Sequence, residues 1–242
     1  MARQTERVLL KLSGGALKGA DGPLSAESME YVADALRSAH SVCPQLAIVL
    51  GGGNIMRGAD TGRKGIRRHR VDQCGMMATL VNALALAEEL EGAGMDAAVM
   101  SATPVPGIAA GYDVDRALEL LRQGTLLLLA GGTGNTYFTT DSAAALRAVQ
   151  LDAGLMLKAT RVRGVFDSDP EKYEDARFYE RITYGDVLKK ELAVMDLPAV
   201  ALCMEHKLSV RVFDFWQEGN LRAVLDGKPI GTLIQGAADG HR

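Results

Sequence analysis

The stretch Leu46-Ala47-Ile48-Val49-Leu50-Gly51-Gly52-Gly53-Asn54-Ile55-Met56-Arg57-Gly58 decides how the rest of the chain is interpreted. Its apolar run ends in three glycines, which an amide and a guanidinium follow closely. A buried strand that stops at glycines brings unhindered backbone N–H groups to its carboxyl end, where they favour an anion. Arg57 adds a planar fork suited to phosphate. The alternative is an ordinary glycine turn with an arginine on the surface.

The same pattern recurs in two other places. Val8–Leu12 runs into Ser13-Gly14-Gly15, and Leu126–Leu129 runs into Gly131-Gly132-Thr133-Gly134-Asn135. In open α/β sheets, ligands bind outside the carboxyl ends of the strands. Three strands that end in glycine therefore indicate one crevice built for phosphate, and phosphate transfer is the working hypothesis.

The composition supports an α/β protein with a substantial core. The 242 residues are 48% hydrophobic and only 5% aromatic, and 27 of them are glycine. A net charge of -3 argues against a general binder of nucleic acid or membrane surfaces, which would be basic. Neither a signal peptide nor a membrane span is visible in the sequence. We therefore expect a cytoplasmic protein whose three cysteines, Cys43, Cys74 and Cys203, are reduced and packed.

Apolar strands alternate with helical periodicities along the chain, which predicts right-handed βαβ units. The fold class expected is α/β, a three-layer αβα arrangement with a central, mostly parallel sheet. We expect one domain over residues 1–242, with lobes 1–152 and 153–242. Strands are expected at Val8–Leu12, Leu46–Leu50, Ala97–Met100, Leu126–Leu129, Leu155–Leu157, Val210–Phe213 and Thr232–Ile234. Helices are expected after Ser25 and Asp113, through Met76–Ala87, from Asp141 to about Leu151, and around Asp186–Glu191, Ala199–His206 and Leu221–Leu225.

Lys11 interrupts an otherwise apolar strand. Burying an ammonium is costly unless an anion compensates it. Phosphoryl transfer spreads negative charge over the moving group, which a fixed lysine would stabilise. Lys158, in Leu157-Lys158-Ala159-Thr160, repeats the motif in the second half, so two lysines from opposite lobes can clamp one phosphoryl group. The alternative is an edge-strand lysine whose ammonium reaches water.

The segment from Gly132 to Asp141 carries hydroxyls, an amide, two aromatic rings and a carboxylate ahead of a helix. Thr139 and Thr140 lie where helix N–H groups favour an anion. Simple N-capping by Thr140 and Asp141 is the alternative without functional meaning. Tyr137 and Phe138 are equally compatible with core packing.

Three further features carry alternatives. Phe166 and Asp169 could bind the base and the ribose of a nucleotide; the alternative is a simple turn with Asp169 before Pro170. Asp72 could accept hydrogen bonds from sugar hydroxyls; the alternative is an aspartate at the start of a helix. The basic run before it can gather an anionic substrate, although a solvated loop is favoured; its members are Arg63, Lys64, Arg67, Arg68, His69 and Arg70. The sequence has no P-loop motif, no GxGxxG after a strand and no clustered His/Cys metal site.

These motifs resemble those of the bacterial uridylate (UMP) kinases, in the amino acid kinase superfamily, over almost the whole chain. Further matching segments are Gly75-Met76, Ala78-Thr79, Val194-Met195-Asp196-Leu197 and Arg211-Val212-Phe213. The resemblance implies an amino acid kinase-like fold and an ATP-dependent, Mg²⁺-assisted transfer of the γ-phosphoryl group to UMP, giving UDP. No general base is needed, because the phosphate of UMP is already an anionic nucleophile. Mg²⁺ would come with ATP, without a dedicated protein cage.

The resemblance also implies residue roles. Lys11 and Lys158 would neutralise the moving phosphoryl group, while Asp141 and Asp196 would orient these cations or the metal. The acceptor would lie over the N-terminal lobe and ATP over the C-terminal lobe. ATP would contact Lys11, Leu12, Ser13, Gly14, Gly53, Arg57, Thr160, Phe166 and Asp169. UMP would contact Gly52, Arg57, Asp72, Thr133, Gly134, Asn135, Thr136, Tyr137, Phe138, Thr139 and Thr140.

At the level of assembly, the resemblance implies a homohexamer with the helix Met76–Leu84 as a dimer contact. UTP would inhibit by occupying the acceptor site. Ala87 and Glu91 stand where members of the family activated by GTP carry basic residues, so activation by GTP is not expected. Two alternatives stay open: another kinase of this fold that acts on a carboxylate or carbamate, and a catalytically silent nucleotide-binding regulator.

Overall fold

The computed structural model describes residues 6–56 and 67–236. Eight helical segments are present in this part of the chain: η1 (Gly14–Ala16), α1 (Ala26–His40), α2 (Arg68–Gly92), α3 (Val114–Gln123), α4 (Thr140–Gln150), α5 (Tyr184–Lys189), α6 (Leu197–Glu205) and α7 (Asn220–Leu225). The strands are β1 (Arg7–Leu12), β2 (Gln45–Leu50), β3 (Ala97–Ser101), β4 (Ala110–Gly111), β5 (Leu126–Ala130), β6 (Leu155–Thr160), β7 (Val165–Phe166), β8 (Phe178–Tyr179), β9 (Arg181–Thr183), β10 (Ser209–Asp214) and β11 (Thr232–Gln235).

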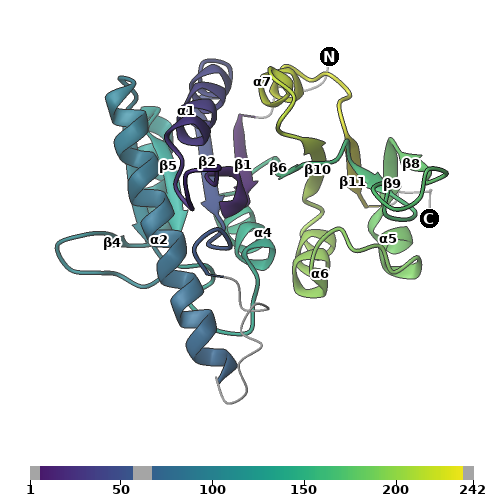
Figure 1. Ribbon diagram of the computed structural model, residues 1–242, viewed down its shortest axis with the longest axis horizontal. Coiled ribbons are helices and arrows are strands. Elements are labelled where there is room, and N and C mark those ends of the chain that lie inside the picture. The colour runs from purple at the N-terminus through teal and green to yellow at the C-terminus, as the bar shows by residue number, and fades with distance from the viewer. Residues whose placement is uncertain (1–5, 57–66, 237–242) are drawn as a thin grey trace.

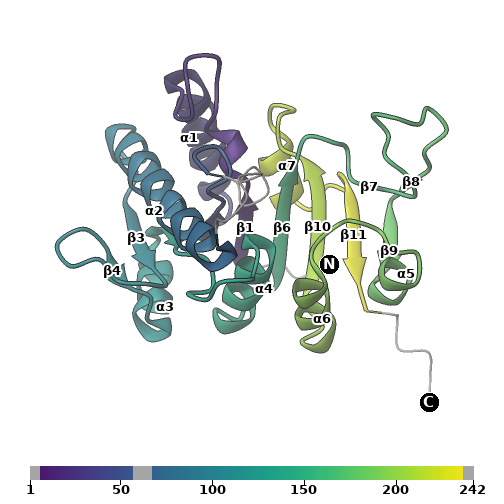
Figure 2. The same ribbon diagram turned by 60° about the horizontal axis from the view of Figure 1, so that its bottom comes forward.

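Nine of the strands form one sheet in the order β4-β3-β5-β2-β1-β6-β10-β11-β9. Neighbours pair in parallel, with the exception of β10 and β11. Figure 2 shows the labelled strands β3, β1, β6, β10 and β11 following one another across the molecule. The predicted α/β class, a mostly parallel sheet between helical layers, is confirmed (Figure 1).

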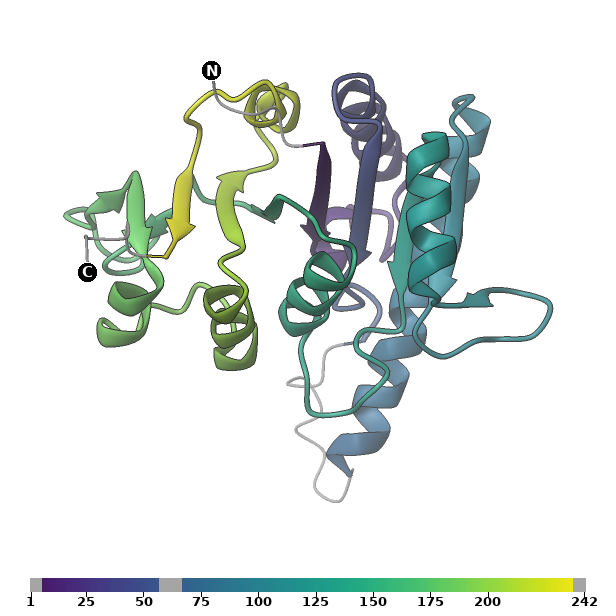
Figure 3. The same cartoon turned by 180° about the vertical axis from the view of Figure 1, so that it is seen from behind.

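The two faces of the sheet carry separate cores. Along β1, Val8 and Leu10 join the cluster that contains side chains of α1, α2 and α7, whereas Leu9 joins the cluster that contains α3, α4 and α6. Successive side chains of a strand point to opposite faces. Lys11 therefore shares the face of Leu9, on which α3 and α4 lie (Figure 3).

The three glycine-ended strands are neighbours, as the hypothesis of one crevice requires. β1 pairs with β2, and β2 pairs with β5. The β1–β6 pairing carries the sheet across the predicted lobe boundary, which falls between α4 and β6. The carboxyl ends of β5, β2, β1 and β6 thus form one continuous edge.

Each predicted strand and helix is present. Most ends are displaced by a few residues, but α2 begins eight residues before the predicted Met76. The elements that the sequence did not indicate are short: β4, β7 and β8 have two residues each, and β9 and η1 have three. Such segments are too short to show a periodicity.

One alternative and two expectations were wrong in detail. The N-cap of α4 is Thr139, whose Oγ1 accepts from the amides of Asp141 at 3.1 Å and Ser142 at 3.4 Å, so neither Thr140 nor Asp141 caps it. The residues 68–70 of the basic run lie in the first turn of α2 rather than in a loop; Arg63 and Lys64 lie outside the described residues.

The cysteines are also not all packed. Cys43 and Cys203 are buried, but Cys74 is exposed on α2. Across residues 6–56 and 67–236, none of the helices combines the length and apolar character needed to span a bilayer.

Candidate active site

The two strand lysines lie side by side. β1 and β6 are adjacent in the middle of the sheet, and Lys11 is the direct register partner of Lys158. The side chains are 12% and 13% exposed. The alternative of an edge-strand lysine reaching water is therefore wrong, and two ammonium groups from the two halves of the chain share one buried location.

Asp141 joins these ammonium groups. It stands in the first turn of α4, and its Oδ1 lies 3.0 Å from Lys11 Nζ while its Oδ2 lies 2.5 Å from Lys158 Nζ. Lys158 also donates to the backbone carbonyl of Val194. The carboxylate offsets the repulsion between the two cations and fixes both at the carboxyl end of the sheet.

The pKa values reflect this arrangement. Burial raises the pKa of the Asp141 carboxyl, but the charges of Lys11 and Lys158 and their hydrogen bonds outweigh burial and hold that pKa below its ordinary value. Burial lowers the pKa of Lys158; the charge of Asp141 opposes this, the charge of Lys11 adds to it, and the net pKa lies below the ordinary value. One carboxylate, that of Asp141, thus serves both ammonium groups directly.

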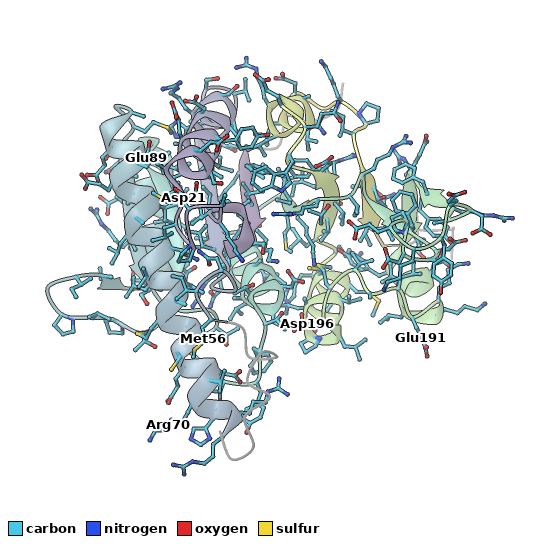
Figure 4. All side chains as sticks on the ribbon, viewed as in Figure 1. Asp21, Met56, Arg70, Glu89, Glu191 and Asp196 are labelled. Atoms are coloured by element: carbon cyan, nitrogen blue, oxygen red, sulfur yellow. The ribbon has the colours of Figure 1, made fainter. Side chains whose placement is uncertain are left out.

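Asp196 lies next to this group, at the N-cap of α6 (Figure 4). Its Oδ2 accepts a 2.6 Å hydrogen bond from Ser142 Oγ, and its charge acts on Lys158. Its Oδ1 is buried and has no hydrogen-bond partner among the described residues. Asp196 therefore contacts neither lysine directly, and one of its oxygens remains available.

The loop that follows β1 at Gly14 packs directly on the loop that follows β2 at Gly51–Asn54. A Cβ on Gly14 would lie 2.3 Å from Asn54 Oδ1 and 2.6 Å from the carbonyl of Gly51, so only glycine fits. Gly51 N donates to the carbonyl of Leu12 at 2.8 Å, and Asn82 Nδ2 donates to the carbonyl of Gly51 at 2.7 Å. The close packing of the two loops thus explains why Gly14 and Gly51 are glycines, in addition to any role in binding phosphate. Ser13, Gly52 and Gly53 follow the same strand ends.

The residues predicted for the nucleoside of ATP surround a pocket beside Lys158. Its volume is about 510 Å³. Thr160, Phe166 and Asp169 line it together with Lys158 and Val194. The ring of Phe166 packs on Phe178 with centroids 5.4 Å apart. The structure thus brings the three residues together within reach of the lysine pair.

The residues predicted for UMP lie on the loop between β5 and α4. Gly131 N donates to Thr79 Oγ1 at 2.7 Å, which anchors the start of this loop to α2. Tyr137 and Phe138 are 60% and 50% exposed, so the core-packing alternative is wrong. Asp72 reaches the loop as well, since its Oδ2 accepts from Tyr137 N at 2.8 Å. Along the loop follow Gly132, Thr133, Gly134, Asn135, Thr136, Thr139 and, opening α4, Thr140.

Arg57, predicted to contact both nucleotides, lies outside the described residues. Several contributors were not predicted: Ser142 and the carbonyl of Val194 beside the lysines, and Asn82 beneath the glycine loops. Asn82 could have been noticed in the sequence, because it is a polar residue inside the apolar run Leu80–Leu84. The structure shows that it is fully buried. The role of a backbone carbonyl such as that of Val194 cannot be recognised from the residue type.

A larger cavity, of about 1160 Å³, lies at the opposite, amino end of the strands. It contains Arg7, but the donors of this guanidinium are bound to Gln45 Oε1 and to the carbonyl of Leu151. The buried cations with a shared carboxylate lie at the carboxyl end, which is therefore the candidate active site.

Comparisons with known proteins identify the family of the chain. The model of the amino acid kinase family matches residues 6–214. The uridylate kinase of Magnetococcus marinus is 45% identical over 233 residues, covering 96% of this chain and 97% of that protein. The uridylate kinase of Escherichia coli K12 is 44% identical over 230 residues, covering 95% of each chain.

The solved structure of the UMP kinase from Bacillus anthracis superimposes with a TM-score of 0.94 at 34% identity, covering 98% of each chain. Sequence and structure thus agree along nearly the whole length. The chain belongs to the amino acid kinase family, among its uridylate kinases.

Proposed function

We propose that this chain transfers the γ-phosphoryl group of ATP to UMP, forming UDP and ADP. The observation that carries the proposal is the pair Lys11–Lys158, bridged by Asp141 at the carboxyl end of the sheet. Lys158 lines the pocket of Thr160 and Phe166, and Asp141 directly follows the loop that precedes α4. The uridylate kinase relatives supply the substrate pair.

The reaction needs charge neutralisation and alignment more than proton transfer. A phosphate oxygen of UMP attacks the γ-phosphorus, and the bond from that phosphorus to the β,γ-bridging oxygen breaks as ADP leaves. Lys11 and Lys158 stabilise the negative charge on the transferred group. Asp141 holds both ammonium groups in place before the substrates arrive, so little reorganisation is required.

We further propose that Mg²⁺ enters with ATP. Among the described residues, no group of three or more His, Cys, Asp or Glu side chains is placed to hold a metal ion. The chain nevertheless fits a metal that ATP carries, since Asp196 Oδ1 is a buried carboxylate oxygen to which no residue of 6–56 or 67–236 donates a hydrogen bond. Bound Mg²⁺ would supply additional neutralisation of the phosphates. Asp196 would contribute one oxygen, held in orientation by its bond to Ser142.

The assembly and its regulation belong to the proposal as well. The exposed face of α2 carries Met77 and Val81, which are 38% and 47% exposed. Such apolar side chains support a contact between two copies through Met76–Leu84. The proposed homohexamer would combine this two-fold contact with a second kind of contact. UTP would compete for the acceptor loop, and the protein would act in the cytoplasm.

A panel assay tests the function. ATP consumption is coupled to a reporter reaction in the presence of UMP, CMP, aspartate or carbamate, and UDP is identified directly. The expected result is turnover with UMP far above the others. Turnover with aspartate or carbamate would instead identify a carboxylate or carbamate kinase. Nucleotide binding without UDP formation would identify a silent regulator. The relatives favour neither of these alternatives.

A further inference from the structure

The amino end of α2 and the loop before α4 meet at one carboxylate. α2 projects beyond the rest of the molecule at this end, and the β5–α4 loop reaches down beside it (Figure 3). Asp72 Oδ2 accepts a hydrogen bond from Tyr137 N at 2.8 Å. Arg68 lies one helical turn before Asp72, with Nε 3.7 Å from the same oxygen and its guanidinium 5.1 Å from the centroid of the Tyr137 ring.

Tyr137 is held in an unfavourable backbone conformation. Its φ is 70°, in the left-handed region that a bulky side chain rarely adopts. Gly131, Gly132 and Gly134 of the same loop also have positive φ values. A loop with so much glycine does not hold such a conformation alone, so the bond to Asp72 and the stacking on Arg68 are the contacts that fix Tyr137 here.

Both contacts made by the Asp72 carboxylate involve the same oxygen. Oδ2 accepts the hydrogen bond from Tyr137 N and faces Arg68, whereas Oδ1 has no polar contact with the described residues. The Asp72 side chain is 18% exposed, so ligand can reach it. With Oδ2 held by Tyr137, the orientation of the carboxylate, and so the position of Oδ1, is fixed.

Stability alone does not explain the arrangement. The side chain of Arg68 is 67% exposed, and an ion pair at 3.7 Å in that setting adds little to folding stability. Arg70, the next arginine of α2, shows the contrast. Side chains two residues apart on a helix point in nearly opposite directions. Among the described residues, the guanidinium of Arg70 donates to Gln73 Oε1 at 3.2 Å and does not reach Asp72.

We propose that Arg68 and Tyr137 are positioning residues of the acceptor site: by holding one oxygen of Asp72, they present the other to the ribose and so set the preference for UMP over its 2′-deoxy form. This inference rests on the proposed function. The group acts through the sugar, at a distance from the reacting phosphates, so it affects acceptor choice and not the chemical step.

The test compares kcat/KM for UMP and 2′-deoxy-UMP. The ratio of the two constants is independent of the folded fraction of each preparation, so partial misfolding does not disturb it. Arg68→Met removes the guanidinium and keeps the length of the side chain. Arg68→Lys keeps the charge and loses the planar fork. Arg70→Met is the matched control, which removes the same charge from the same turn on another side of the helix.

We expect Arg68→Met to lower the preference for UMP by about 3- to 10-fold, as for a weakened hydrogen bond to a charged group. The loss should appear mainly in KM for UMP, with kcat little changed. Arg68→Lys should restore part of the preference, and Arg70→Met should leave it at the wild-type value. Asp72→Asn should reduce the preference the most.

Two results overturn the inference. One is an Arg68→Met variant whose preference equals that of wild type, and the other is an equal loss of preference in Arg70→Met, which would indicate a general charge effect. Failure of the proposed function would look different, because wild-type protein would then not convert UMP to UDP at all.

Discussion

Asp141 lies between two ammonium groups that would repel each other without it. Both lysines are nearly buried, and each touches a different oxygen of the carboxylate. A buried charge whose partner is removed costs about 3–5 kcal/mol. Asp141 therefore makes it possible for two ammonium groups to be buried among the apolar side chains of the sheet.

Loss of one of these cations should affect turnover more than binding. Lys158→Ala removes an ammonium from beside the transferred group, so we expect kcat to fall by about 100-fold or more. KM for UMP should change much less, since the acceptor loop is intact. Steady-state kinetics with varied UMP at saturating ATP measure both constants. Wild-type kcat in the variant would remove Lys158 from the mechanism.

The lowered pKa of Lys158 predicts a pH dependence. The charged form is the active one, and burial brings its deprotonation to a lower pH than the ordinary 10.5. As pH rises, kcat/KM for UMP should therefore decline below pH 10.5. In Lys158→Arg the guanidinium stays charged, so any residual activity should lack this decline. A wild-type profile that is flat up to pH 10.5 would contradict the assignment.

Single residues were predicted from the sequence where their chemistry conflicts with their surroundings. Lys11 and Lys158 stand out because each is a charge within an apolar run. Ser142 did not, since a serine at the start of a helix is common and nothing local indicates that it binds Asp196. The bond from Tyr137 N to Asp72 joins residues 65 positions apart, which no local pattern reveals.

At the scale of elements, the site depends on which strands are neighbours. The register that pairs Lys11 with Lys158 comes from parallel contact between β1 and β6, which are separated by most of the first lobe. The sequence predicts both strands, but their pairing is a non-local choice among many. The first turn of α4 then brings Asp141 to the same face.

The packing of two loops gives a prediction at this scale. In Gly14→Ala the new Cβ would meet Asn54 and the carbonyl of Gly51 well inside van der Waals contact. We expect the free energy of unfolding to fall by about 1–3 kcal/mol, as for an overpacked core. Chemical denaturation measures the change.

Gly15→Ala is the matched control for this prediction. The nearest atom to its added Cβ is Ser13 Oγ at 3.6 Å, an ordinary contact. Its free energy of unfolding should stay within about 0.5 kcal/mol of wild type. If both alanine variants lost the same stability, close approach of the β1 and β2 loops would not be the reason for glycine at residue 14.

At the scale of the whole molecule, one sheet carries both proposed nucleotide sites. The strands before residue 152 support the proposed acceptor loop, and β6 with the segments after it supports the proposed donor pocket. In the proposed reaction the reacting groups would meet where β1 and β6 pair. The sequence predicted this architecture because strands that end in glycine alternate with helices along it. The edge strands β4 and β9 were not predicted, because they are only two and three residues long.

The central claim is that Lys11 and Lys158 act together on one migrating phosphoryl group. A double-mutant cycle tests it most directly, with kcat for UDP formation measured in wild type, Lys11→Met, Lys158→Met and the double variant. Residues that act as a unit show strongly non-additive losses. We expect the double variant to lose much less than the product of the two single losses. Single losses that multiply fully, or a single variant with wild-type kcat, would contradict the account.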